Sequence, residues 1–300
     1  MIKFPSLVII LCIASSSILA QTTYNKTEIK VQRSHSFEAS DIMEDYNAVL
    51  RNLEAPSPDG EGYRSFLMRQ KVESRKQFPL KSEANVGPKK KTTAQPSVGQ
   101  GFPLTRKLFN GTLINYIGGI PCDNALAVSN GGIVLAGINS VIWAHDLNGD
   151  STLFSTDVIS LSSIAKGTLS DNFYDPKLIY DENADRFILV FLKNNVPASS
   201  QIIVCFSKSN NPIDGWNVYT LPGNPLNNNR WTDFPAINIT NDKFYVTGNL
   251  IVPGVSWQIG FDGSVIWEMD KAAGYNNDTN MTTALYAQVK FNGKFTRNIH

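Results

Sequence analysis

Acidic residues at the start of repeated segments are the main candidates for chemistry in this sequence. Asp175 directly precedes a proline, Asp233 lies two residues before another, and each heads a short apolar run. A glycosidase needs two carboxylates about 5 to 10 Å apart across its substrate. If the run starts surround one pocket, Asp175, Asp233 and Arg230 converge on a ligand. The alternative is a structural hydrogen bond repeated in each unit, so we predict ligand binding here and assign no catalytic residue.

A second acidic cluster has the spacing of a calcium loop. Asp146, Asn148 and Asp150 follow the D-x-N-x-D pattern that brings side-chain oxygens toward one cation, and Asp157 falls at the twelfth position. Ser151 occupies the sixth position, where the pattern requires glycine, and no helices are expected on either side. The alternative is a polar β-turn in which these side chains bind nearby backbone. Calcium is therefore the one cofactor that the sequence suggests.

No nucleophile and base can be paired. The three histidines are too few and too scattered for a metal site, and no Ser-His-Asp arrangement can be assigned. Cys12 lies in the N-terminal apolar segment, which leaves Cys122 and Cys205, too few for a zinc cluster. One disulfide between them is an option in an oxidising compartment. Because Cys205 lies in an apolar run, we expect it to be an inert, buried thiol.

A repeat of β-hairpins must position these candidates. Three segments each open with Asp and continue through an apolar stretch, a polar turn and a second apolar stretch: residues 123–137, 175–190 and 233–247. Their starts are roughly 50 to 60 residues apart, and a period of that length built from short strands is typical of a β-propeller blade. Further strands complete each unit, such as Ser256–Phe261 and Ser264–Met269 across a tight turn at Asp262-Gly263. We predict an all-β fold of propeller-like, four-stranded blades, with a β-sandwich as the alternative.

The whole chain divides into three parts. Residues 105–300 have room for about three blades and a partial fourth, which Tyr286–Phe295 would begin. Propellers usually close with four to eight blades. We therefore expect a truncated, N-terminal portion of a longer protein. Residues 21–104 are polar and basic, which predicts a mostly disordered linker of low order with possible short helices. Residues 1–20 combine an early Lys3, a short apolar run and small residues, which is typical of a signal peptide, with an uncleaved anchor as the alternative.

Charge and apolar length exclude two classes of partner. The net charge is +1, so no global field attracts nucleic acid. The run Lys89–Lys91 reads as a solvated charge run in a secreted protein. No second apolar stretch is long enough to span a bilayer, so the mature chain is expected to have no transmembrane segment.

Several blade-forming motifs carry a resemblance to a known group. They are Pro121–Gly132, Asp175–Asp181 with Arg186-Phe187, Phe206–Pro212 with Gly215-Trp216, and Trp231–Pro235. With the Leu-Ala-Gln at the end of the signal, they resemble secreted β-propeller-type proteins of the type IX secretion system, over roughly residues 115–250. The resemblance implies an extracellular or outer-surface protein, often with a C-terminal sorting domain, which is not recognisable in this chain.

These observations lead to one functional expectation and one alternative. We expect a secreted or cell-surface binding or adhesion scaffold whose loops bind a glycan or an extracellular protein. The alternative is a sialidase-like enzyme that processes glycans. The scaffold is favoured because the loops are rich in Asn, Trp and Tyr, whereas no credible acid/base pair is evident.

Overall fold

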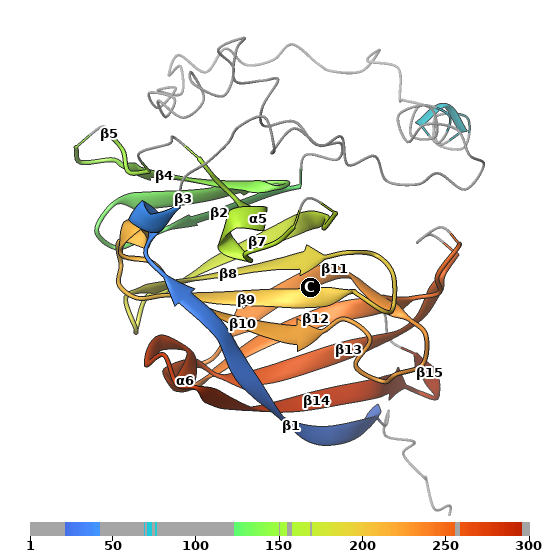
Figure 1. Cartoon of the computed structure of the whole chain (residues 1–300). Coiled ribbons are helices and arrows are strands. Elements are labelled where there is room, and N and C mark those ends of the chain that lie inside the picture. Colours follow the sequence, from blue (N-terminus) through green and yellow to red (C-terminus); the bar gives the residue numbers. More distant parts are fainter. Residues whose placement is uncertain are drawn as a thin grey trace, which may run out of the picture.

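The computed structural model describes residues 22–42, 69, 71–73, 76, 123–149, 151–154, 158–168, 170–255 and 259–295 (Figure 1). Within them the chain is all-β with short helices only, so the predicted all-β, propeller-like fold is confirmed. Residues 69, 71–73 and 76 are helical, inside one of the short helices expected in the linker. The signal peptide, Cys122 and Asp150 lie outside the described residues. No helix in the described ranges is long and apolar enough to cross a membrane.

Three antiparallel meanders follow one another along the chain. The first contains β2 (Asn124–Val128), β3 (Ile133–Ile138), β4 (Val141–Asp146), β5 (Ser151–Thr152) and β6 (Ile159–Ser160), followed by helix α5 (Leu161–Ile164). The second contains β7 (Phe173–Asp181), β8 (Arg186–Lys193), β9 (Gln201–Ser207) and β10 (Trp216–Pro222). The third contains β11 (Trp231–Ile239), β12 (Lys243–Ile251), β13 (Phe261–Asp270) and β14 (Asn280–Phe291). The 3-10 turns Ala39–Asp41 and Pro212–Asp214, helix α6 (Lys271–Tyr275) and strand β15 (Lys294–Phe295) complete the described elements.

The second meander is buried on both faces, which explains its unbroken apolar strands. Along β8, Ile188 and Val190 face the third meander, whereas Phe187 and Leu189 face the first. Successive residues of a strand point to opposite sides, so a strand between two sheets must be apolar at every position. Free Cys205 of β9 is likewise fully buried, and burial raises the pKa of its thiol well above the usual range. The predicted burial of this thiol is therefore confirmed.

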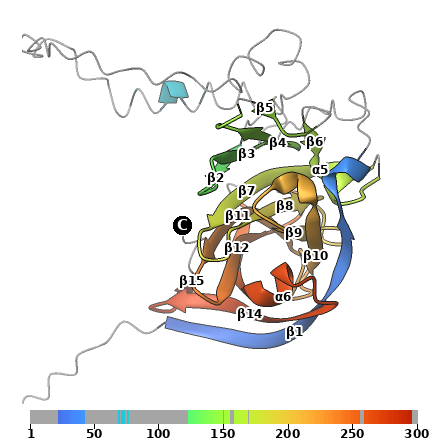
Figure 2. The same ribbon diagram turned by 90° about the vertical axis from the view of Figure 1, so that its left-hand side faces the viewer.

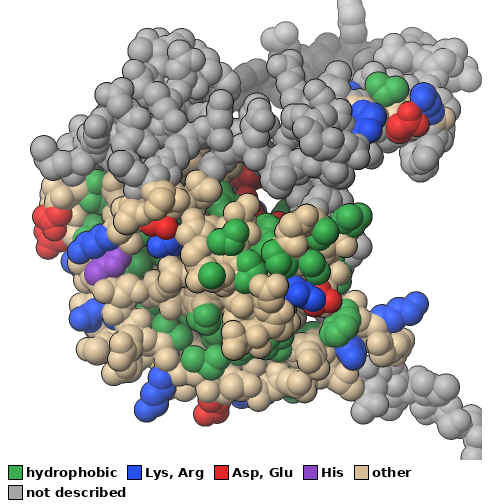
Figure 3. Space-filling model, turned by 45° about the vertical axis from the view of Figure 1, so that its right-hand side comes forward, with side chains coloured by type: hydrophobic (Ala, Val, Ile, Leu, Met, Phe, Trp, Pro, Cys, Tyr) green, Lys and Arg blue, Asp and Glu red, His purple; other side chains and the backbone are tan. Residues whose placement is uncertain are grey.

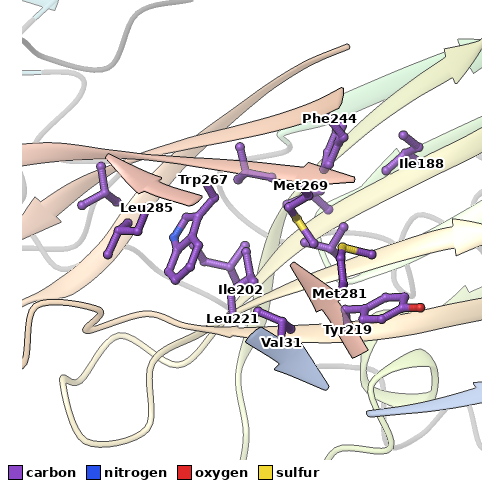
Figure 4. Close-up of a cluster of buried hydrophobic side chains, with 14 of the residues drawn as sticks. Val31, Ile188, Ile202, Tyr219, Leu221, Phe244, Trp267, Met269, Met281 and Leu285 are labelled. Atoms are coloured by element: carbon purple, nitrogen blue, oxygen red, sulfur yellow. The ribbon is translucent and has the colours of Figure 1, made fainter. Parts of the chain in front are cut away.

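The core between the second and third meanders is closely packed around large side chains (Figure 4). Trp267 and Met269 of β13 meet Ile202 of β9 and Leu221 of β10 there. Helix α6 lies at one end of this core, visible inside the ring of strands in Figure 2. A Cβ at Gly274 of α6 would lie 2.6 Å from the ring of Phe206, so only glycine allows this approach.

In the third meander, two strand boundaries expected from the sequence are wrong. Asp262 and Gly263 were expected to form a turn between two strands, but both lie inside β13, where the register with β12 shifts between Leu250 and Ile251. An extra residue in one strand is a β-bulge, which bends a strand without ending it. The fourth strand is therefore β14, and Tyr286–Phe295 completes the third meander with the β14–β15 hairpin; it does not begin a fourth blade.

The N-terminal strand differs from the expectation for residues 21–104. Residues Thr22–Phe37 form β1, a strand of 16 residues that pairs antiparallel first with β14 and then with β10. It thus joins the outer edges of the second and third meanders into one sheet, as Figures 1 and 2 show. Strands β11 and β7 are the two ends of this strand order. They lie side by side, so the sheet nearly closes into a barrel.

Candidate functional site

Among the first strands of the three meanders, β7 (Phe173–Asp181) lies beside both β2 and β11. In β7 the register shifts between Tyr174 and Lys177, and in β11 it shifts between Asp233 and Ala236. Each shift is a bulge that contains a proline, a residue that cannot donate to a strand ladder and suits such a site. The hairpins that begin with β7 and β11 therefore correspond in the position of their bulges.

The two aspartates occupy positions that differ by one residue. Asp175 and Phe234 are the equivalent bulge residues, and both have a φ of 54°. Asp233 instead aligns with Tyr174, the last residue before the bulge in β7. The left-handed conformation costs free energy in any residue other than glycine, and such strain is more frequent at functional sites than elsewhere.

Asn139 connects the first meander to the second at this place. Its amide Nδ2 donates to Asp123 Oδ2 at 3.4 Å, and its Oδ1 accepts from the backbone N–H of Asp175 at 3.3 Å. A Cβ on Gly137 of β3 would already lie 3.0 Å from Pro176, so the two strands approach closely. Asp123, which begins the first repeat, is thereby held beside Asp175. We call Asp123, Asp175 and Asp233 the acidic centre.

Burial and mutual repulsion raise the pKa values of two members of the acidic centre. Asp175 has a pKa of about 8, because burial, then the charges of Asp233 and Asp123, disfavour its ionised form. Its carboxyl also shares a hydrogen bond with Asp123, which the protonated form of Asp175 can donate. Burial and the charge of Asp123 raise the pKa of Asp233 to about 6, against a backbone hydrogen bond from Phe234 that lowers it. At neutral pH the centre therefore holds a proton.

Aromatic and cationic side chains border the acidic centre. Phe234 is 47% exposed, and Lys177 Nζ lies 5.7 Å from the centroid of its ring. The Tyr174 hydroxyl donates to the carbonyl of Asn194, and its pKa is raised by burial and by the charges of Asp233 and Asp175. Two members of the acidic centre thus lie at the same pair of bulges as a partly exposed aromatic side chain, and small-ligand sites combine a few polar groups with aromatic surface.

Arg230, the third predicted ligand residue, is engaged elsewhere. Its Nε donates to Asp262 Oδ2 at 2.8 Å, and its Nη1 donates to the carbonyls of Asn228 and Asn229. Asp175 and Asp233 lie close enough to affect each other electrostatically, whereas the Arg230 guanidinium is paired with Asp262 of β13. Asp123, Asn139 and Phe234 are the neighbours that the sequence analysis did not assign to the site.

The predicted calcium loop has the hydrogen bonds of a turn in its described part. The backbone N–H of Asn148 donates to Asp146 Oδ1 at 2.9 Å, and Asn148 Nδ2 donates to the carbonyl of Gly131 at 2.7 Å. Among the residues that the structure describes, no group of three or more His, Cys, Asp or Glu is arranged to hold a metal ion. Calcium binding stays a prediction; a rise in unfolding temperature with calcium that Asp146→Ala abolishes would establish it.

This chain was compared with protein-family models, curated proteins and solved structures. No protein-family model, curated protein or solved structure matches this chain.

Proposed function

We propose that this protein is a binding scaffold, secreted or displayed on the outer cell surface, that holds a glycan at the acidic centre. The observation that carries the proposal is the convergence of Asp123, Asp175 and Asp233, one from the start of each repeat, together with the exposed side chain of Phe234 at the bulge of β11. A sugar offers hydroxyl groups to carboxyl oxygens and an apolar face to an aromatic ring. The resemblance to exported propeller-type proteins supports the location, and a protein partner is the alternative ligand.

The pattern of charge favours a neutral, hydroxyl-rich ligand over an ionic one. Protonated Asp175 donates its one O–H to Asp123, and the remaining oxygens of Asp175 and Asp233 can accept hydrogen bonds from ligand hydroxyls. Lys177 is engaged with the ring of Phe234 and adds a nearby positive charge. An anionic ligand would meet repulsion from the carboxylates.

A glycan array tests this proposal with matched variants. Asp233→Asn and Phe234→Ala are expected to reduce retention of the bound glycans by about tenfold each, the effect of about 1.4 kcal/mol in binding free energy. Glu182→Gln removes a carboxylate from the exposed turn between β7 and β8, away from the bulges, and should leave binding unchanged. Binding that survives both site variants, or no binding to any glycan, would refute the assignment of the site.

A glycan-processing enzyme is the second candidate, and one observation favours it. The pKa values of Asp175 and Asp233 fall on either side of neutral pH, as a general acid and a general base or nucleophile require. Chromogenic glycosides provide the test. Turnover that either Asp175→Ala or Asp233→Ala abolishes, with folding intact, would identify an enzyme; binding without turnover would leave the scaffold.

A further inference from the structure

A cluster of tyrosines lies on the outward face of the third meander, away from the acidic centre. In β12, β13 and β14 the side chains of Phe244, Trp267 and Leu285 point into the core. Strand alternation therefore turns their neighbours Tyr245, Glu268 and Tyr286 outward. Strand β1 extends this face, because Lys26 pairs directly with Tyr286. The face is thus one continuous surface across four adjacent strands.

Hydrogen bonds and ring contacts fix these side chains relative to one another. The hydroxyls of Tyr286 and Tyr245 donate to Glu268 Oε2 at 3.1 and 3.4 Å. The rings of Tyr24 and Tyr286 meet edge to face with centroids 5.3 Å apart, and Lys26 Nζ lies 5.5 Å from the centroid of Tyr286. We call Tyr24, Tyr245, Tyr286, Glu268 and Lys26 the tyrosine platform.

The tyrosine platform is partly exposed to solvent and still has hydrogen-bonding capacity. Tyr24 is 55% exposed and Lys26 is exposed, whereas Tyr245, Glu268 and Tyr286 are half-buried. Both tyrosine hydroxyls use Oε2 of Glu268, which leaves Oε1 for a ligand because a carboxylate accepts about four hydrogen bonds. Tyrosines held in place lose little side-chain entropy on binding, which is why they recur in recognition surfaces.

Charge on this face selects the class of ligand. Along β1, Lys26 and Lys30 alternate with Glu28, and Glu268 lies on β13, on the other side of β14. Figure 3 shows one face of the molecule, on which the basic and acidic side chains are scattered among hydrophobic and uncharged ones. Nucleic acids and anionic polysaccharides require a surface with a clear positive excess, which this one lacks. A neutral sugar chain needs aromatic faces and both donors and acceptors, which the tyrosine platform supplies.

We propose that the tyrosine platform is a second binding site, for a neutral oligosaccharide, and that β1 completes it by contributing Tyr24 and Lys26. It does not depend on the acidic centre, because the two sites share no residue. Strands in a sheet are about 4.8 Å apart, so the platform extends about 14 Å from β12 to β1, long enough for more than one sugar ring.

Saturation-transfer NMR on the full chain tests the inference with three soluble probes, maltohexaose, cellohexaose and chitohexaose. At least one is expected to bind, and Tyr24→Ala should weaken its affinity about tenfold or more. Glu268→Gln should also weaken it, whereas Tyr286→Phe, which keeps the ring, should have the smallest effect. Because Tyr24 is exposed, Tyr24→Ala should melt close to the parent protein, which separates loss of binding from loss of folding.

The Phe234→Ala variant distinguishes the two sites. Binding that is lost with Tyr24→Ala and retained with Phe234→Ala supports the tyrosine platform, even if the acidic centre binds nothing. The opposite pattern supports the acidic centre and overturns this inference. Absence of binding at up to about 10 mM of each hexaose, where a Kd of ~1 mM would nearly saturate the site, would also overturn it.

Discussion

The acidic centre makes the stability of the folded protein depend on pH in an unusual direction. The pKa of Asp175 is about 8 and that of Asp233 is about 6, both above the value of ~3.9 for an unfolded aspartate. The folded state therefore binds protons more tightly at these two residues. Their contribution to stability is fully present below about pH 4 and is lost as the pH rises through about 6 and then about 8.

Asp175→Asn isolates this effect. Asparagine is permanently neutral and can still donate a hydrogen bond to Asp123, so it mimics the protonated form. We expect the variant to unfold at a higher temperature than the parent at pH 8 and at a similar temperature at pH 4, measured as the difference between the two proteins at each pH. Glu182→Gln is the charge-matched control. An equal difference at both pH values would contradict the pKa of Asp175.

A buried ion pair holds helix α6 against the second meander. Lys271 Nζ lies 2.6 Å from Asp181 Oδ2, with side chains 5% and 1% exposed, and the Tyr275 hydroxyl donates to the same oxygen at 2.9 Å. Burial alone would raise the pKa of Asp181, but the bonds from Lys271 and Tyr275 lower it. Removing one partner leaves the other charge buried without compensation, which is more costly than losing a surface pair.

Asp181→Asn is accordingly expected to lower the free energy of unfolding by about 3 to 5 kcal/mol in denaturant titrations at neutral pH. Lys243→Met, which breaks the more exposed pair between Lys243 and Asp270, should change it by less than ~1 kcal/mol. Similar small effects of both substitutions would show that the Lys271–Asp181 pair does not clamp the helix.

Among the elements, β1 shows what sequence patterns cannot reveal. Val31 and Phe37 are the buried apolar residues of this strand, Ile29 packs partly buried against the core, and most other positions are polar, so its composition resembles the linker that follows. A strand that joins two edges is held largely by backbone hydrogen bonds, which leave only a weak hydrophobic period in the sequence. Strands β8 and β9 were predictable because burial on both faces demands continuous apolar residues.

The acidic centre was predictable only in part, for a similar reason. Asp123 begins the first repeat just as the other two aspartates begin theirs, and this recurrence was the available signal. Its distance from Asp175 depends on how β2 packs beside β7, which local patterns do not specify. The contact of Arg230 with Asp262 likewise depends on a bulge inside β13, at the place where a turn was expected.

Removal of β1 is expected to make the protein self-associate. Without residues 22–42, the edges of β10 and β14 would both present unpaired backbone groups, and exposed edges readily pair with other chains. Light scattering should give a larger molar mass per particle for the chain without these residues, as dimers or larger species, than for the full chain at the same concentration. A stable monomer with a sharp melt would show that β1 is dispensable for covering these edges.

For the whole molecule, the position of β1 predicts the behaviour of a cleaved chain. The segment between about Lys81 and Gln100 is basic, contains Pro and Gly and has few apolar residues, so it is a favourable site for trypsin. Strand β1 precedes that segment, yet its residues pair with β14 and β10 and place Val31 and Phe37 in the two core clusters.

Cleavage should therefore produce two fragments that elute together in size-exclusion chromatography under native conditions and separate only in denaturant. The backbone hydrogen bonds of a 16-residue strand and two buried apolar side chains hold the N-terminal fragment without a covalent link. As a control, Thr282→Cys with Lys30→Cys, opposite each other in β14 and β1, should form a disulfide that keeps the fragments joined in denaturant until a reductant is added. Separation of the fragments in native buffer, or first cleavage within residues 170–255, would contradict this arrangement of the chain.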